Sequence, residues 1–413
     1  MANAMPALAA AGSIGPSVDS AEWILFIATL IGVAVFHRHA ARASVIGLVA
    51  IVIFKLSIGG FPGGTGVAGL ERHLAGEWVE LANLLGLLLG FAVLAQHFER
   101  TRIPASLQSY LPRGWTGPFV LLAVVFLLSG FLDNIAAAVI GGVMAHAVFR
   151  SRVHIGYLAG IVAASNAGGA GSVLGDTTTT MIWIHGVAAQ QILPAYVGSG
   201  VALIVFGVPA SIQQHRFSPL APMGPDPVLI DWGRVAIVGL VLLSTLTTNV
   251  FINTMFPDSS ESFPWLSAAL WITLLATAAL RKPDWHVLPE AARGALFLIA
   301  LVVAASLMPV GHLPIPSWRT ALGLGALSAV FDNIPLTALT LKQGGYDWSV
   351  IAYSVGVGGS MMWFGSSAGV ALTAMYPTAR STTRWLQDGW HVCVAYVIGF
   401  VALMCFDGWH PDP

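Results

Sequence analysis

The sequence predicts an all-α polytopic membrane protein that is built from two inverted repeats. Two observations carry this prediction. First, 56% of the 413 residues are hydrophobic and only 9% are charged, and the mean hydropathy of +0.79 is far above that of soluble proteins. Second, one pair of polar motifs occurs twice, in the same order, inside apolar segments. The formal net charge of −1 argues against nucleic acid as a partner and leaves membrane lipid as the expected one.

The first polar stretch runs from Ser165 to Met181 and reads SNAGGAGSVLGDTTTTM. Its glycines weaken a helix, and its hydroxyl and amide side chains offer partners to the freed backbone or to a ligand. Asp176 is its only charged residue. We therefore expect a membrane helix over 155–185 that is broken at mid-depth. Irregular backbone persists at that depth only where it is buried in protein or lines a wet cavity, so the break marks a candidate functional site.

A matching stretch lies 190 residues further on. Its glycines at 358, 359 and 365 match those at 168, 169 and 175, and Ser366 and Ser367 stand where the first copy has Asp176 and Thr177. Upstream of each stretch is an Asp-Asn pair, in FLDNIAAAV and in VFDNIPLTAL, and these pairs are 199 residues apart. Two motifs in the same order at nearly the same offset indicate an internal repeat, and paired helix interruptions indicate the binding site of a secondary transporter.

The domain organisation follows from the apolar segments, because about 20 apolar residues cross a membrane as a helix. We expect a disordered tail over 1–20, the first repeat over 21–212, a cytoplasmic linker over 213–231, the second repeat over 232–406 and a tail over 407–413. Unbroken spans are expected near 21–36, 44–60, 79–97, 189–212, 232–252, 265–280, 292–310 and 387–406, and broken ones over 155–185 and 346–378. The stretches 115–149 and 320–341 are each centred on Asp-Asn and are expected to be re-entrant hairpins.

Re-entrant hairpins do not cross the membrane, so each repeat is expected to cross it five times. An odd number of crossings inverts the second repeat and lets both hairpin tips meet both helix breaks near the midplane. Basic residues support this topology: with Arg38 and Arg42 inside, 14 Lys and Arg residues are cytoplasmic and 3, including Lys342, are external. Both termini are then external in a multi-pass protein of the inner membrane. Lys55 falls within a span, where snorkelling or a structural ion pair is expected.

Three carboxylates stand alone in apolar surroundings, namely Asp133, Asp176 and Asp332. A charge at the bilayer centre is costly, so each acid is expected to be protonated, paired or bound to a cation. Burial raises the pKa of a carboxyl group and a bound cation lowers it, so protons and Na⁺ or Li⁺ compete for such a group. We expect these three acids to hold the exchangeable ion, with no resident cofactor. The other candidate ion-binding residues are Asn134, Ser165, Asn166, Thr177, Asn333, Ser366 and Ser367.

Other interpretations of the three acids stay open at this point. Asp is a good N-cap residue, so each acid could serve only to begin a helix. Half-helices present both signs of dipole, so the alternative to a cation exchanger is a carrier of an anion such as citrate, another di- or tricarboxylate, or arsenite. The motifs contain no arginine, which favours the cation. An enzyme is not expected, because an intramembrane aspartyl protease has no use for the duplicated glycine breaks.

Four phrases, FLDNIAAAV, SNAGGAGSVLGDTTTTMIWI, VFDNIPLTAL and GGSMMWFGSSAGVAL, resemble the ion transporter superfamily, which includes citrate transporter-like proteins, and most closely its NhaD-type sodium/proton antiporters. The resemblance covers roughly residues 75–406. It implies a homodimer in which the early spans of each repeat form a scaffold and the hairpins and broken helices form a transport domain that moves as an elevator. By match, it implies that the ion site contains Asp133, Asn134, Asp176, Asp332 and Asn333. In the dicarboxylate members of the superfamily, the sequence at the hairpin tips resembles Ser-Asn-Thr. Both tips read Asp-Asn-Ile in this chain, and this difference disfavours a carboxylate substrate.

Overall fold

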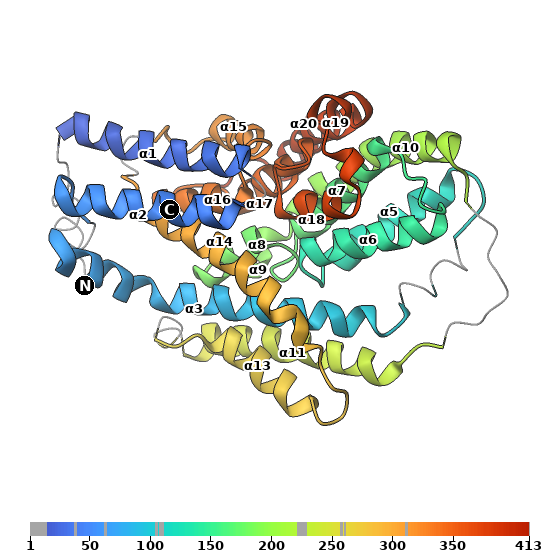
Figure 1. Cartoon of the computed structure of the whole chain (residues 1–413), viewed down its shortest axis with the longest axis horizontal. Coiled ribbons are helices and arrows are strands. Elements are labelled where there is room, and N and C mark those ends of the chain that lie inside the picture. The colour runs from blue at the N-terminus through green and yellow to red at the C-terminus, as the bar shows by residue number, and fades with distance from the viewer. Residues whose placement is uncertain are drawn as a thin grey trace.

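The computed structural model describes residues 15–36, 39–61, 64–103, 106, 111–220, 229–256, 259, 262–309 and 313–412. In these residues the regular secondary structure is helical, and the one pairing of β type is an isolated bridge between Phe61 and Gly64. Many of the helices run roughly along the long axis of the molecule (Figure 1). The predicted all-α architecture is therefore confirmed.

Each half of the chain contributes a similar series of helices. The first half contains α1 Gly15–Val35, α2 Ala40–Ser57, α3 Gly66–Glu99, α5 Thr116–Ser129, α6 Asn134–Val148, α7 Ile155–Gly169, α8 Thr177–Ile184, α9 Ala189–Ile192 and α10 Ala195–Phe217. The second half contains α11 Trp232–Met255, α13 Trp265–Thr277, α14 Leu288–Ser306, α15 Trp318–Ser328, α16 Asn333–Gln343, α17 Trp348–Gly358, α18 Ser367–Met375, α19 Thr382–Asp388 and α20 Trp390–Phe406. Every span expected to be unbroken overlaps one of these helices, and each stretch expected to be a hairpin or a broken helix contains two.

By length and composition, three helical segments of the described chain suffice to cross a membrane: Gly66–Glu99, Ala189–Phe217 and Trp285–Ser306. A fourth is added if α19 and α20, which meet at a bend of 61°, count as one span. Helices α5, α6 and α13 are apolar but shorter. The ten crossings and the side on which each loop lies stay predictions.

The structure moves two of the predicted boundaries and gives the C-terminal tail a packing contact. Helix α1 begins at Gly15, so residues 15–20 are helical rather than part of a disordered tail, and residues 1–14 lie outside the described chain. Helix α10 continues to Phe217, five residues into the predicted linker, because the apolar sequence is followed by polar residues that remain good helix formers. The tail over 407–412 packs against the start of α17, where His410 N donates to Asp347 Oδ2 at 2.8 Å.

Polar side chains begin several helices at the ends of the molecule. Asp347 Oδ1 accepts the backbone N–H groups of Ser349 and Val350, which is an N-cap for α17. Asp231 caps α11 in the same way and also accepts a hydrogen bond from Arg281 Nε at 3.2 Å. This hydrogen bond with Arg281 holds the pKa of the Asp231 carboxyl below its ordinary value.

Two hydrophobic clusters fill the interior. The larger contains side chains of α5, α6, α7, α10, α17 and α20. The smaller joins α1, α2, α3 and α14, and it takes in Ile334, Ala338 and Leu339 of α16. Helix α16 therefore lies where the two clusters meet, with its first residues near the centre of the molecule and its last residues toward the left end in Figure 1.

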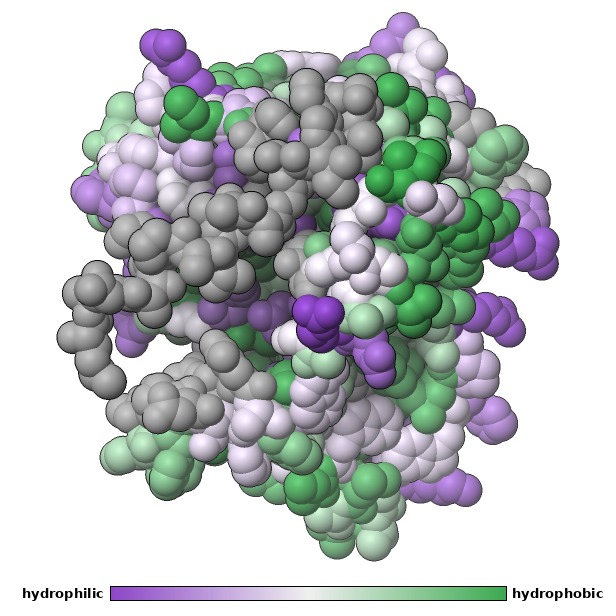
Figure 2. All heavy atoms as spheres, turned by 90° about the vertical axis from the view of Figure 1, so that its left-hand side faces the viewer, coloured by the Kyte–Doolittle hydropathy of each residue, from purple (hydrophilic) through white to green (hydrophobic). Residues whose placement is uncertain are grey.

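The outer helices expose apolar side chains along one face. On α1, Ile24, Ile27 and Ile31 are 66%, 44% and 50% exposed, and their spacing places them on a single stripe. Helices α2, α11 and α20 expose similar residues, and Figure 2 shows hydrophobic side chains gathered along the right flank of one end of the molecule. Contiguous apolar faces of this kind are unfavourable in water and suit contact with lipid.

Lys55 forms the structural ion pair that the sequence allowed. Its Nζ atom lies 2.7 Å from Glu22 Oε2, and both side chains are at most 5% exposed.

We expect Lys55→Met to lower the free energy of unfolding by about 3–5 kcal/mol, because it leaves the Glu22 carboxylate buried without a cation. Thermal unfolding of the detergent-solubilised protein measures this. Glu22→Gln together with Lys55→Met should recover most of the loss, and Lys282→Met, at an exposed lysine, should change stability by less than about 0.5 kcal/mol. A single Lys55→Met variant as stable as the parent contradicts the buried pair.

Candidate functional site

Asp176 lies at the centre of the molecule, in the gap between the half-helices α7 and α8. It is the N-cap residue of α8 and is 1% exposed. Asn134 Nδ2 donates to Asp176 Oδ1 at 2.7 Å, and Asn333 Nδ2 lies 3.4 Å from Oδ1 and 3.5 Å from Oδ2. Asn134 and Asn333 are the first residues of α6 and α16, so one amide from each Asp-Asn motif reaches the same carboxylate.

Asn166 joins the two broken helices. Its Oδ1 atom accepts from Asn134 Nδ2 at 3.1 Å, and its Nδ2 atom donates to Ser360 Oγ at 2.9 Å and to Ser366 Oγ at 3.1 Å. Ser366 is the N-cap residue of α18, as Asp176 is of α8. The structure thus brings Asn134, Asn166, Asp176, Asn333 and Ser366 into one hydrogen-bonded network.

Asp332 is the second acid, at the start of α16. Its Oδ1 atom accepts from Ile334 N at 3.2 Å, so Asp332 does cap its helix. Its Oδ2 atom accepts from Ser367 Oγ at 3.0 Å, which capping alone does not require. Both residues line a cavity of about 760 Å³, whose exposed wall carries His39, Arg42, Glu290 and Arg293.

Asp133 is the third acid and occupies the corresponding place at the start of α6. It shares a cavity of only about 10 Å³ with Thr177, the residue that matches Ser367 in the repeat. Apolar side chains of α3 line this cavity. Those side chains are Leu84, Leu87, Leu88 and Phe91. One acid of the pair therefore lines a wide cavity, while its counterpart lines a very small one.

Ser165 differs from the other candidate residues. Its hydroxyl donates to Val162 O, one turn earlier in α7, at 2.9 Å. Its carbonyl accepts from Ser129 Oγ, so the residue joins α7 to the end of α5. Ser165 therefore contributes to the packing of the broken helix, and its hydroxyl has a partner outside the polar network.

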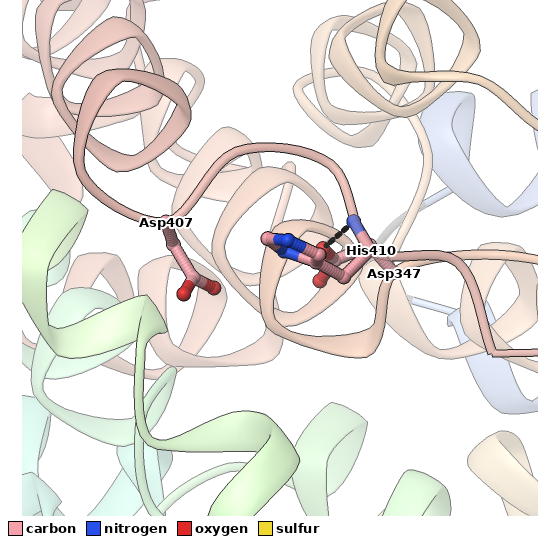
Figure 3. A group of neighbouring side chains, drawn as sticks. All are labelled: Asp347, Asp407 and His410. Atoms are coloured by element: carbon pink, nitrogen blue, oxygen red, sulfur yellow. Dashed lines mark hydrogen bonds between the residues drawn. The ribbon is translucent and has the colours of Figure 1, made fainter.

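The three acids do not form a single cluster. Among the described residues, one group of three acidic or histidine side chains has its ligand atoms within 4.8 Å of one another, and it consists of Asp347, Asp407 and His410 (Figure 3). Asp347 is already occupied in that group, because its carboxylate accepts hydrogen bonds from Ser349, Val350 and His410. We interpret the group as an anchor of the C-terminal segment on α17.

The two halves repeat several contacts at the offsets of the sequence motifs. Ser129 Oγ donates to Ser165 O in the first half, and Ser328 Oγ donates to Val355 O at 2.8 Å in the second. A Cβ atom on Gly168 would overlap the carbonyl of Phe126, and one on Gly358 would overlap the carbonyl of Gly325. Each hairpin therefore packs against its broken helix through glycine in the same way.

Sequence reasoning missed two residues at this site and did not single out a third. Ser360 contacts Asn166 from the second break. Thr178 is fully buried beside Asp176 in the chain, and its hydroxyl has no hydrogen-bond partner among the described residues. A Cβ atom on Gly356 would lie 3.2 Å from Asp176 Oδ2, so α17 approaches the carboxylate closely there. The run of four threonines from Thr177 did indicate hydroxyl groups at the site. Only one or two of these four hydroxyls can face one side of a helix, so the run by itself did not identify Thr178.

The apolar helices and the buried polar network at their interruptions define the class of protein. The chain is a multi-pass membrane protein whose polar groups gather at mid-molecule, where a membrane protein places a site of transport.

Relatives define the type more closely. No family model matches the chain. The chain is 27% identical over 404 residues to sodium/proton antiporter 1 of Arabidopsis thaliana, with 88% of this chain and 68% of the relative covered. It is 27% identical over 357 residues to the Na⁺/H⁺ antiporter NhaD of Vibrio parahaemolyticus, with 74% of this chain and 84% of the relative covered. It is 24% identical over 394 residues to the Na⁺/H⁺ antiporter NhaD of Alkalimonas amylolytica, with 80% of this chain and 78% of the relative covered. The predicted resemblance to NhaD-type antiporters is confirmed.

Proposed function

We propose that the chain is a secondary transporter that exchanges Na⁺ or Li⁺ for H⁺ across the inner membrane, and that it has no enzymatic activity. The observation that carries this proposal is the buried Asp176 carboxylate, which receives one amide from each hairpin tip. The names of the relatives support the same exchange.

Asp176 has the chemistry that an exchange of cation for proton requires. A carboxylate at this depth is stable when it is protonated or when it binds a cation, and it cannot do both at once. Its hydrogen-bond partners are neutral amides, and the network contains no Lys or Arg. No positively charged side chain of the network therefore neutralises the carboxylate. Binding of Na⁺ therefore releases the proton, and release of Na⁺ allows the proton to return. Hydroxyl oxygens of Thr178, Thr177 and Ser367 are the ligands that a hard monovalent cation prefers.

The two unequal cavities support an alternating-access cycle. Asp332 and Ser367 face the cavity of about 760 Å³ next to Arg42 and Arg293, which the distribution of basic residues places on the cytoplasmic side. Asp133 and Thr177 share a cavity of only about 10 Å³, which side chains of α3 line. In our proposal, this is the state that is open to the cytoplasm, and the opposite state opens the Asp133 half-site instead.

The contacts between helices support an elevator and two inverted repeats. Helices α1, α2, α3 and α14 share one hydrophobic cluster, which also contacts α8 and α16. We assign these four helices to the scaffold and the hairpins and broken helices to the transport domain, with both clusters packing one part against the other. In Figure 1, α5 and α6 lie to the right of the centre, whereas α15 and α16 lie to the left of it. We further propose a homodimer with both termini external.

Movement of protons in everted membrane vesicles tests the exchange. In vesicles that hold a respiration-driven pH gradient, we expect millimolar NaCl or LiCl to dissipate the gradient, and KCl and citrate to leave it unchanged. The apparent affinity for Na⁺ should fall as the pH is lowered, because protons occupy the same carboxylate. Vesicles without the protein serve as the control. A response to citrate without one to Na⁺ contradicts the proposal and favours an anion carrier.

A further inference from the structure

A lysine ties the end of α16 to the end of α14. Lys342 lies in the last turn of α16, and its Nζ atom donates to the carbonyl oxygens of Ser306 and Met308. These carbonyls lie at the C-terminal end of α14, where the last carbonyl groups of a helix lack intrahelical partners and carry the negative end of its dipole. Lys342 therefore makes two charge-assisted hydrogen bonds to backbone and does not simply extend toward water.

The same end of α14 is also fixed to α3. His73 Nε2 lies 3.0 Å from Ser306 Oγ and 3.3 Å from Glu77 Oε1. The buried Glu22–Lys55 pair joins α1 to α2 within electrostatic reach of Lys342. This end of the molecule is therefore closed by polar contacts among five helices, whereas the cavity opens beside Arg42 and Arg293 at the other ends of α2 and α14.

Helix α16 connects this closed end to the ion site. It has 11 residues and is therefore about 16 Å long. Its first residue, Asn333, reaches Asp176, and the preceding Asp332 faces the large cavity. A short helix moves as a unit, so any shift of α16 along α14 moves Lys342, Asn333 and Asp332 together.

We propose that Lys342 is a positioning residue for ion exchange: its bonds to the Ser306 and Met308 carbonyls hold α16 where Asp332 faces the cavity, and the cycle requires these bonds to break. The proposal rests on the proposed function, because it assigns Lys342 to one of the two alternating states. Movement of α16 toward its own C-terminal end would carry Lys342 beyond the last carbonyls of α14. Removing the ammonium group should therefore favour the opposite state.

Accessibility of a cysteine in the cavity tests this proposal without relying on transport. Ala371 lines the cavity with Asp332, and the parent chain has only two cysteines, Cys393 and Cys405. In a Cys393→Ser, Cys405→Ser, Ala371→Cys background, we expect Lys342→Met to slow labelling by a membrane-impermeant maleimide several-fold in everted vesicles. Lys342→Arg should label at nearly the parent rate, and so should Lys282→Met, which removes the charge of an exposed lysine.

Labelling of Lys342→Met at the parent rate overturns the proposal, because a purely structural lysine would change protein yield but not the balance between two states.

If the Lys342→Met variant does not accumulate, a crosslinking experiment replaces the labelling experiment. In a Cys393→Ser, Cys405→Ser background, we expect a short reducible thiol crosslinker between Lys342→Cys and Met308→Cys to stop Na⁺-dependent proton movement, and a reductant to restore it. A crosslinked protein that still exchanges ions at the uncrosslinked rate also overturns the proposal. Absence of Na⁺ exchange in the parent, with the labelling shift intact, instead counts against the proposed cargo.

Discussion

Asp176→Asn is expected to reduce Na⁺-dependent proton movement to the background of vesicles that lack the protein. Asparagine has nearly the same shape as aspartate, and its carbonyl oxygen can still accept the hydrogen bond from Asn134 Nδ2. It cannot release a proton or carry a negative charge, so it cannot alternate between H⁺ and Na⁺. The fluorescence of a pH-sensitive dye in everted vesicles measures the loss.

A second aspartate provides the control for this variant. Asp407 is partly exposed and lies just after α20, away from the hairpin tips. Asp407→Asn should therefore keep the parent rate of exchange, and both variants should give the elution profile of the parent in detergent. If Asp176→Asn exchanges ions at the parent rate, Asp176 is not the exchanging group, and Asp133 or Asp332 must take that role.

The sequence predicted the local features of the site because each one departs from its apolar surroundings. Glycines located both helix breaks and an isolated acid marked the first of them, and α7 and α17 do end at Gly169 and Gly358. The Asp-Asn pairs located both hairpin tips, since α6 and α16 each begin at the Asn. The contact of both Asn residues with Asp176 follows from the duplication once the tips meet at the centre.

Features that depend on how helices pack could not be predicted in this way. Glu22 and Lys55 are separated by a helix connection, and only the packing of α1 on α2 makes them a pair. The difference in size between the two cavities depends on where α3 and α14 lie relative to the hairpins, which the repeated motifs do not specify. Lys342 was expected on the external side, but its bond to the end of α14 depends on how α16 packs against that helix.

Gly168→Ala is expected to prevent the protein from reaching its native packing. A Cβ atom at this position would overlap the backbone carbonyl of Phe126, which belongs to α5 and cannot rotate away as a side chain does. We expect a loss of about 3 kcal/mol or more in the free energy of unfolding, at the upper end of the cost of overpacking. Gly358→Ala should behave alike, because the Gly325 carbonyl occupies the corresponding place in the second half. Thermal unfolding of the detergent-solubilised variants, monitored by size-exclusion chromatography, measures both effects.

Gly200→Ala is the matched control, because Gly200 is a helical glycine of α10 with no atom within 4 Å of an added Cβ. Alanine has the higher helix propensity, so this variant should be as stable as the parent or more stable by up to about 1 kcal/mol. The comparison separates the loss of glycine flexibility from the overlap itself. If Gly168→Ala matches Gly200→Ala in stability, α5 and α7 are not in backbone contact at this point. The position of the first hairpin against the broken helix, on which the contact of Asn134 with Asp176 depends, would then be wrong.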